Sequence, residues 1–171
     1  FFFKQKTAYE IRNCDWSSDV CSSDLEHVKS RFIVVTAGGN MGLHTRAYAS
    51  MFERVYVFEP ELRNFVALTR NCQYENVYFF RAALGKKEDR WGHINKTNQE
   101  TNTGMHKVIG KEDGHIPIMT IDELNLPRCD LIQLDIEGGE PNAIRGAEQT
   151  IAKWKPVVIT EGNHGEVRSL L

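Results

Sequence analysis

The sequence predicts one α/β domain with a doubly wound, mainly parallel sheet, and three observations carry this prediction. Short apolar runs rich in β-branched residues alternate with helical patterns along the chain. A glycine-rich turn, Gly38 to Gly42, follows the first of these runs. An acid, Glu59, ends the second run about 20 residues after the turn, which is the layout of a nucleotide-binding βαβ unit.

The individual elements follow from the apolar periodicity. Helices are expected where apolar residues recur on one face, and Pro141 suits a first helical turn because its missing amide has no partner to lose. Because strands and helices alternate, we expect a parallel sheet with helices on both faces. Strands are predicted at 31–35, 55–58, 76–81, 130–135 and 156–161, and helices at 41–54, 61–73 and 141–154.

Composition excludes several classes of protein. The chain has 171 residues, 41% of them hydrophobic, and a net charge of −2, so it can build a core and carries no excess positive charge for nucleic acid. No apolar run reaches the roughly 20 residues of a membrane helix. Cys72 and Cys129 lack metal or redox spacing, so we expect ordinary thiols, no metal, and a reducing, cytoplasmic location.

The first 25 residues stand apart from the rest. Residues 3–11 and 15–25 resemble the translation of a common sequencing-library adapter, and the three residues between them fall where a variable index would stand. We therefore expect residues 1–25 to be an irregular, artefactual segment and residues 26–171 to hold the domain. The alternative is a genuine N-terminal arm with a Cys14–Cys21 disulfide.

The glycine spacing separates two classes of cofactor. Gly38-Gly39-Asn40-Met41-Gly42 lacks the Gly-x-Gly-x-x-Gly that brings backbone against a pyrophosphate. S-adenosyl-L-methionine has a ribose but no phosphate, so it needs the ribose acid without the phosphate cradle. The turn and Glu59 therefore favour S-adenosyl-L-methionine over a nicotinamide cofactor. A plain turn in another doubly wound domain is the alternative without a ligand.

Three carboxylates follow the strand predicted at 130–135, namely Asp135, Glu137 and Glu140. In open α/β sheets, ligands bind at the carboxyl ends of the strands. Because desolvating carboxylates is costly, their clustering indicates a cationic or hydrogen-bonding partner. Asp135 and Glu137 are candidates for ordering an acceptor or taking its proton, whereas Glu140 is expected to stabilise the positive end of the next helix.

Residues 86–119 interrupt the alternation of strands and helices. The stretch from Trp91 to Gly114 is rich in Asn, Thr, Gly, Lys and His, and it could form edge strands, a mobile lid, a substrate loop or a solvated excursion. His93, His106 and His115 could assist there as bases, although loop histidines are more often simply solvated.

Five motifs, taken in their order along the chain, resemble those of FkbM-type S-adenosylmethionine-dependent methyltransferases. The resemblance runs from about Ile33 to Glu161. The matching phrases are Thr36-Ala-Gly-Gly-Asn-Met-Gly42, Tyr56-Val-Phe-Glu-Pro60, Ala82-Ala-Leu-Gly85, Thr120-Ile-Asp-Glu-Leu124 and Leu134-Asp-Ile-Glu-Gly-Gly-Glu140. The resemblance implies methyl transfer, often to a hydroxyl of a sugar, glycan or small natural product. It implies that Asp135 and Glu137 face the reacting groups. It implies a cofactor site made of Thr36, Gly38, Gly39, Asn40, Gly42, Glu59, Pro60, Ala82 and Asp135.

The chain departs from this family in two respects. Thr36 stands where the family has an acid that helps to hold the methionine ammonium group, and a hydroxyl brings no charge. A non-catalytic binding domain is therefore a further alternative. Methyltransferases of this fold usually end in antiparallel strands, so we expect an incomplete sheet, with residues 162–171 starting a helix. The acceptor, the choice between oxygen and nitrogen, and the oligomeric state are left open.

Overall fold

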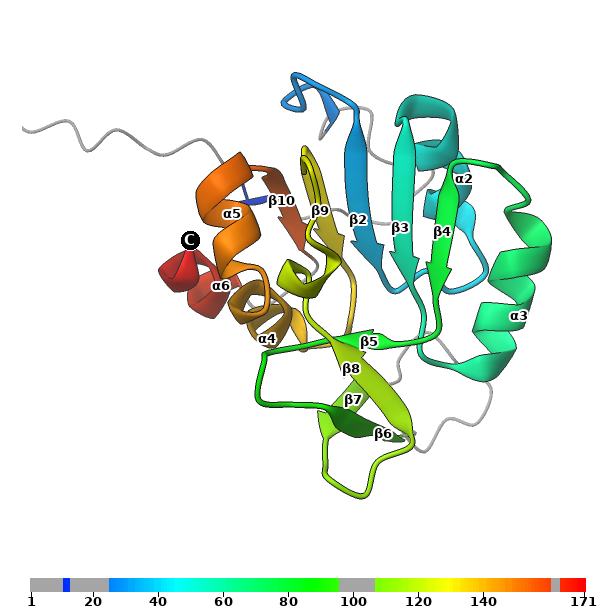
Figure 1. The fold of residues 1–171 in the computed structure, drawn as a ribbon, viewed down its shortest axis with the longest axis vertical. Coiled ribbons are helices and arrows are strands. Elements are labelled where there is room, and N and C mark those ends of the chain that lie inside the picture. Colours follow the sequence, from blue (N-terminus) through cyan, green and yellow to red (C-terminus); the bar gives the residue numbers. More distant parts are fainter. Residues whose placement is uncertain (1–10, 13–24, 96–106, 161–163) are drawn as a thin grey trace, which may run out of the picture.

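Two sheets form the framework of the structure (Figure 1), a computed structural model that describes residues 11–12, 25–95, 107–160 and 164–171. The larger sheet has the strand order β1-β10-β9-β2-β3-β4, and all of its neighbouring strands are parallel. The smaller sheet has the order β5-β8-β6-β7. The larger sheet confirms the predicted α/β class.

The strands of the larger sheet lie close to their predicted positions. β2 neighbours both β3 and β9, so the turns that follow these three strands meet at one edge of the sheet. The residue Glu161 lies outside the described residues. The strands are β1 (Ile11–Arg12), β2 (Ile33–Ala37), β3 (Arg54–Phe58), β4 (Val77–Phe80), β9 (Leu131–Leu134) and β10 (Val157–Thr160).

Residues 1–25, which we expected to be irregular, contribute two features to the described structure. Ile11–Arg12 form β1, which pairs in parallel with β10 at the edge of the larger sheet. Leu25 is buried with Val28 and Phe52 on the face of that sheet that also packs against Tyr48 and Leu68. The described parts of this segment therefore pack against the domain.

Helices cover both faces of the larger sheet (Figure 1). Helices α2 (Leu43–Met51) and α3 (Leu62–Asn71) lie on one face, where Tyr48 and Leu68 pack against Val55 and Val57. Helices α4 (Glu140–Arg145), α5 (Glu148–Trp154) and α6 (His164–Leu170) lie on the other face. Each central strand is therefore buried on both sides, as its continuous apolar run indicates.

The single helix predicted at 141–154 is wrong, because the chain breaks into α4 and α5 at Gly146. A Cβ at Gly146 would lie 2.1 Å from the carbonyl oxygen of Gly85, and the Gly146 carbonyl accepts a 2.9 Å hydrogen bond from the amide of Asp122. The Asp122 carboxylate also accepts hydrogen bonds from the amides of Gln149 and Thr150, at 3.0 and 2.8 Å. These contacts with Gly85 and Asp122, both distant in the sequence, therefore end α4 and begin α5.

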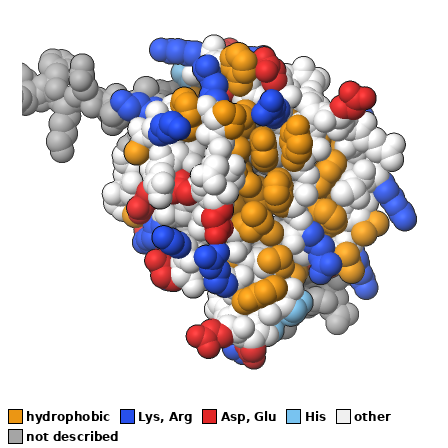
Figure 2. Space-filling view, viewed as in Figure 1, with side chains coloured by type: hydrophobic (Ala, Val, Ile, Leu, Met, Phe, Trp, Pro, Cys, Tyr) orange, Lys and Arg blue, Asp and Glu red, His pale blue; other side chains and the backbone are white. Residues whose placement is uncertain are grey.

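Aromatic rings stack on the face of β3 and β4 that α2 and α3 leave uncovered. Ring centroids are 5.0 Å apart for Tyr56 and Tyr78, 6.2 Å for Tyr56 and Phe80, and 4.7 Å for Phe58 and Phe80. Tyr78 is 43% exposed. Figure 2 shows hydrophobic side chains gathered over this part of the sheet. The stacked rings therefore extend from the buried core, at Phe58, to the protein surface, at Tyr78.

The smaller sheet accounts for much of the segment that interrupts the alternation. It lies beyond the ends toward which the main strands point (Figure 1), and His106 lies outside the described residues. Its own core consists of Ala83, Ile116 and Ile118, against which Ile94 and Val108 pack. The described strands form a second sheet of their own rather than edge strands of the larger sheet. They are β5 (Ala83–Leu84), β6 (Trp91–Asn95), β7 (Lys107–Gly110) and β8 (Ile116–Met119).

No helix within the described ranges is both long enough and apolar enough to cross a bilayer. A short 3₁₀ helix, η2 (Asp122–Leu124), joins the smaller sheet to the chain that enters β9.

Candidate functional site

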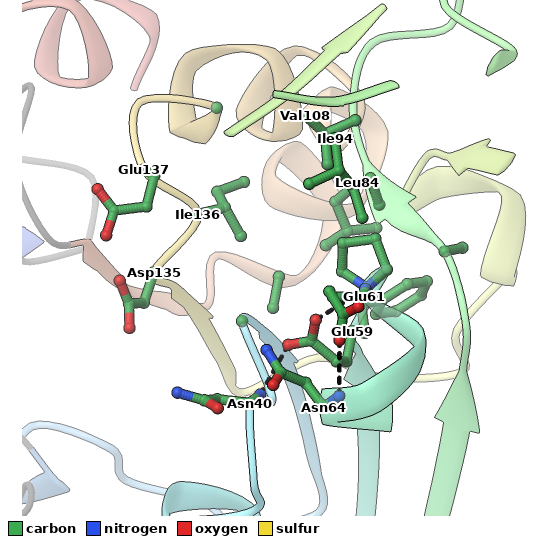
Figure 3. Close-up of a pocket in the computed structure, with 17 residues that line it drawn as sticks. Asn40, Glu59, Glu61, Asn64, Leu84, Ile94, Val108, Asp135, Ile136 and Glu137 are labelled. Carbon is green, nitrogen blue, oxygen red and sulfur yellow. Dashed lines mark hydrogen bonds between the residues drawn. The ribbon is translucent and has the colours of Figure 1, made fainter. Parts of the chain in front are cut away.

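A pocket opens where the turns after β2, β3 and β9 meet the smaller sheet (Figure 3). It holds about 710 Å³ of empty space when its open mouth to the solvent is included. Its lining residues are Ala37, Gly38, Asn40, Phe58, Glu59, Pro60, Glu61, Asn64, Ala82, Ala83, Leu84, Ile94, Val108, Asp135, Ile136, Glu137 and Gly139.

The backbone amides of the glycine turn are already engaged. The amides of Gly38 and Gly39 both donate to the carbonyl of Phe58, at 3.0 and 3.1 Å. The amide of Asn40 donates to Oε2 of Glu59 at 2.7 Å. Because these three amides point toward β3, they do not form the cradle that a phosphate group requires.

Gly39 and Gly42, both expected to bind the cofactor, shape the turn without lining the pocket. A Cβ at Gly39 would lie 2.6 Å from Cγ2 of Val57. Gly42 has a φ of +95°, and a Cβ there would lie 2.4 Å from the sulfur of Cys72. Close packing against β3 and α3 therefore requires glycine at both positions.

Thr36, also an expected cofactor residue, does not line the pocket. It lies within β2 rather than after it, it is only 1% exposed, and it pairs with Gln133 across β2 and β9. Its hydroxyl donates a hydrogen bond to the side-chain oxygen of Gln133. The pocket begins one residue later, at Ala37.

Glu59 is the buried acid of the pocket, at 5% exposed. Its two carboxylate oxygens accept hydrogen bonds from the amides of Asn40, at 2.7 Å, and Glu61, at 2.9 Å. Burial raises the pKa of the Glu59 carboxyl, and the two backbone hydrogen bonds oppose this shift. A carboxylate has about four acceptor positions, so capacity remains for a ligand that offers hydroxyl groups.

Asp135 and Glu137 both line the pocket. Figure 3 shows them on the side opposite Glu59 and Glu61, with Ile136 pointing between the two pairs. Asp135 is held against the glycine turn, since its amide donates to the carbonyl of Ala37 at 3.1 Å. The two acidic regions singled out from the sequence therefore meet across one pocket.

Three apolar residues of the smaller sheet form one wall of the pocket. The sequence did not predict this wall. This apolar wall consists of Leu84, Ile94 and Val108 (Figure 3). Ile94 and Val108 are register partners in β6 and β7. Their pairing is non-local and carries no turn signature in the sequence, which explains why the pattern alone did not reveal it. Glu61 and Asn64, at the start of α3, were also missed.

The described histidines of the smaller sheet lie away from the pocket. The rings of His93 and His115 are 5.1 Å apart between centroids, and Nε2 of His93 lies 3.4 Å from Oδ1 of Asp113. Neither histidine lines the pocket. Across the described parts of the chain, no three His, Cys, Asp or Glu side chains gather so as to hold a metal ion.

An open parallel sheet with a buried acid after β3 and an acidic turn after β9 is the arrangement of Rossmann-like methyltransferase domains. The chain belongs to the FkbM methyltransferase family, since the sequence pattern of the Methyltransferase FkbM domain matches residues 6–171. That match begins within the segment that we expected to be adapter-derived.

A solved structure supports the fold. The methyltransferase FkbM from Methylobacillus flagellatus KT is similar over 83% of this chain and 36% of that one, with a TM-score of 0.54 and 20% sequence identity. The chain thus spans about a third of the length of that relative. No curated protein matches the chain.

Proposed function

We propose that this domain binds S-adenosyl-L-methionine and transfers its methyl group to a hydroxyl of a sugar, glycan or small natural product. The observation that carries the proposal is the charge of the pocket. Glu59, Glu61, Asp135 and Glu137 line it, and no Lys or Arg is among the described lining residues. Because four acidic side chains with no basic residue among the described lining residues make the pocket negatively charged, it suits a cationic ligand.

The same features disfavour a nicotinamide cofactor. A dinucleotide brings a pyrophosphate, which needs free backbone amides or basic side chains. The amides of Gly38, Gly39 and Asn40 already have partners, and the surrounding carboxylates would repel an anion.

Each end of S-adenosyl-L-methionine finds suitable groups in the pocket. Glu59 would accept hydrogen bonds from the ribose hydroxyls, and the apolar wall would contact the adenine. Oδ1 of Asn40 is buried and has no hydrogen-bond partner among the described residues, so it and Asp135 would face the methionine ammonium group. When bound, this cofactor supplies a methyl group carried on a positively charged sulfur.

The chain's own contribution to methyl transfer would be alignment and proton removal. Holding two reactants in line can contribute roughly 7–11 kcal/mol. Asp135 and Glu137 would receive the proton that an acceptor hydroxyl loses.

A reducing, cytoplasmic setting accords with the free, buried thiols of Cys72 and Cys129.

Calorimetry with the whole chain tests the proposal. S-adenosylmethionine and S-adenosylhomocysteine should bind, and NAD should not. Glu59→Ala should weaken binding by roughly tenfold or more, since a hydrogen bond to a charged group is worth about 1.5–3 kcal/mol. Glu53→Ala, which removes an exposed acid just before β3, is the matched control. Tight NAD binding would overturn the assignment.

Failure to bind any of these three ligands would favour the alternative of a non-catalytic domain. For the acceptor, the chain is incubated with S-adenosylmethionine and a panel of sugars and polyhydroxylated small molecules. Formation of S-adenosylhomocysteine that depends on a hydroxyl compound supports O-methylation, whereas turnover confined to amines contradicts it.

A further inference from the structure

We infer that Glu140 is a positioning residue that holds Asp135 and Glu137 at the methionine end of the pocket, an inference that rests on the proposed function. Glu140 is 0% exposed, although it lies in the first turn of a short helix, α4. It does not itself line the pocket. Carboxylates are almost never fully buried without a specific partner, so its place in the fold calls for an explanation.

The partner of Glu140 is the backbone of the acidic turn. Oε1 of Glu140 accepts a 3.1 Å hydrogen bond from the amide of Ile136, the residue between Asp135 and Glu137. The N-cap residue of α4 is Gly139, which has no side chain, and Glu140 follows it in the first turn. The expected role in stabilising the helix end leaves this bond to the preceding turn unexplained. Oε2 of Glu140 is buried and has no hydrogen-bond partner among the described residues.

The turn that Glu140 holds has an unusual backbone. Ile136 accepts a 3.1 Å hydrogen bond from the amide of Gly139, which closes a four-residue turn. Its two central residues have positive φ, +53° at Glu137 and +86° at Gly138, as in a type I′ turn. A residue such as Glu adopts this conformation only where its surroundings impose it, and such residues concentrate at functional sites.

The other end of the turn is fixed by β2. The amide of Asp135 donates to the carbonyl of Ala37 at 3.1 Å, and the Asp135 carbonyl packs directly on Gly38. Asp135 is therefore held by the sheet and Ile136 by Glu140, which together orient the backbone from which Glu137 projects. Glu59 has separate partners, Asn40 and Glu61, so the ribose side of the pocket does not depend on Glu140.

This independence predicts a selective defect. Without the Glu140 carboxylate, the Ile136 amide loses its partner, and the turn can leave the strained conformation. Asp135 and Glu137 would then no longer face the amino-acid end of the ligand. Recognition of the ribose and adenine would persist.

Two ligands separate these effects. S-adenosylhomocysteine carries the amino-acid end, whereas 5′-methylthioadenosine has the same nucleoside thioether without it. Affinities are measured by calorimetry for the unchanged chain and for Glu140→Ala, Glu140→Gln and Glu148→Ala. Glu148 is an acid in the first turn of α5 that lies outside the pocket, so Glu148→Ala is the matched control.

We expect Glu140→Ala to weaken S-adenosylhomocysteine at least tenfold and 5′-methylthioadenosine less than threefold. Glu140→Gln retains an oxygen for the Ile136 amide and should stay within threefold for both ligands, as should Glu148→Ala. Equal losses for both ligands in Glu140→Ala, or no loss for either, would overturn the inference.

Gly138→Ala provides a second test if Glu140→Ala does not fold, as judged by circular dichroism. It strains the same turn at a positive φ while leaving Glu140 in place, and it should give the same selective loss. An unchanged ratio of the two affinities in this variant contradicts the inference. If the unchanged chain binds neither ligand, the proposed function fails and the inference falls with it. If the unchanged chain binds both and the variants keep its ratio, only the inference fails.

Discussion

The backbone amide of Asn40 donates a 2.7 Å hydrogen bond to Oε2 of Glu59. This bond joins the glycine turn after β2 to the acid after β3, two features that are 19 residues apart in the chain. Asn40 has a φ of +43°, in the left-handed region that Asn tolerates better than most residues. The Glu59 carboxylate therefore supports the shape of the turn in addition to offering acceptor positions to a ligand.

The affinity for S-adenosylmethionine should fall as the pH is lowered through the raised pKa of Glu59. Burial raises this pKa above its ordinary value of 4.5, and protonation removes the charge that attracts a cation and accepts from ribose. Calorimetry from neutral pH downward should show the decline. In Glu59→Gln, this part of the pH dependence should be absent, and an equally steep decline there would contradict the assignment.

The same pKa shift has a consequence for the stability of the ligand-free chain. The folded state binds the Glu59 proton more tightly than the unfolded state does, so this group favours folding at low pH, and that contribution is lost as the pH rises from 4.5 through the raised pKa. The free energy of unfolding of Glu59→Gln should therefore rise relative to that of the original chain over this window. Urea denaturation at a series of pH values measures the difference.

Gly38→Ala should destabilise the fold and weaken cofactor binding together. The added Cβ would lie 2.0 Å from the carbonyl oxygen of Asp135, at a φ of +86°, and such strain costs about 1–3 kcal/mol. Relief of the clash would move the acidic turn. Urea denaturation and calorimetry measure the two effects.

Gly165→Ala is the control for Gly38→Ala. This glycine lies in α6, with nothing within 4 Å of the added Cβ, and Ala should stabilise the helix by up to about 1 kcal/mol. A Gly38→Ala variant as stable as Gly165→Ala would show that the two turns are not packed together as described.

Val108→Ala should weaken S-adenosylmethionine about fivefold, because it removes roughly 1 kcal/mol of apolar contact from the wall of the pocket. Ile109→Ala changes the next residue of β7, which is 47% exposed and does not line the pocket, and it should leave the affinity unchanged. Calorimetry of both variants checks the difference. Equal affinities in the two variants would remove β7 from the site.

Thr36→Val should reduce stability without changing cofactor affinity. The variant leaves the buried side-chain oxygen of Gln133 without its donor, at a cost of about 1–3 kcal/mol. Thr69→Val is the control, since the Thr69 hydroxyl is exposed and bonds within α3. A tenfold loss of affinity in a folded Thr36→Val variant would return Thr36 to the cofactor site.

Local patterns in the sequence were sufficient to predict the larger sheet. The apolar runs around Val34, Val55 and Ile132 identify strands by themselves, because each is buried on both faces. Glu59 and Asp135 could also be predicted to lie at the same edge of the sheet, since each follows a parallel strand and the carboxyl ends of parallel strands share one edge.

The features that were missed depend on contacts between distant segments. The break between α4 and α5 requires Asp122, which caps a residue 28 positions later. The apolar wall requires β6 to pair with β7. The first strand was predicted to end at Val35, but β2 continues to Ala37, so Thr36 lies within the strand and its hydroxyl donates to Gln133 of β9. Apart from Gly146, which stands at the helix break itself, these outcomes depend on partners that are distant in the sequence.

The larger and the smaller sheet should differ in the free energy of local unfolding. The larger sheet lies between two extensive clusters of buried side chains, whereas the smaller one has a core of Ala83, Ile116 and Ile118. Elements with few buried contacts open at lower free energy than the global core. Amide hydrogens of β6 and β8 should therefore exchange with solvent well before those of β2 and β9. Under the proposed function, a nucleoside would then be released by separation of one wall, while the strands that carry the carboxylates remain folded.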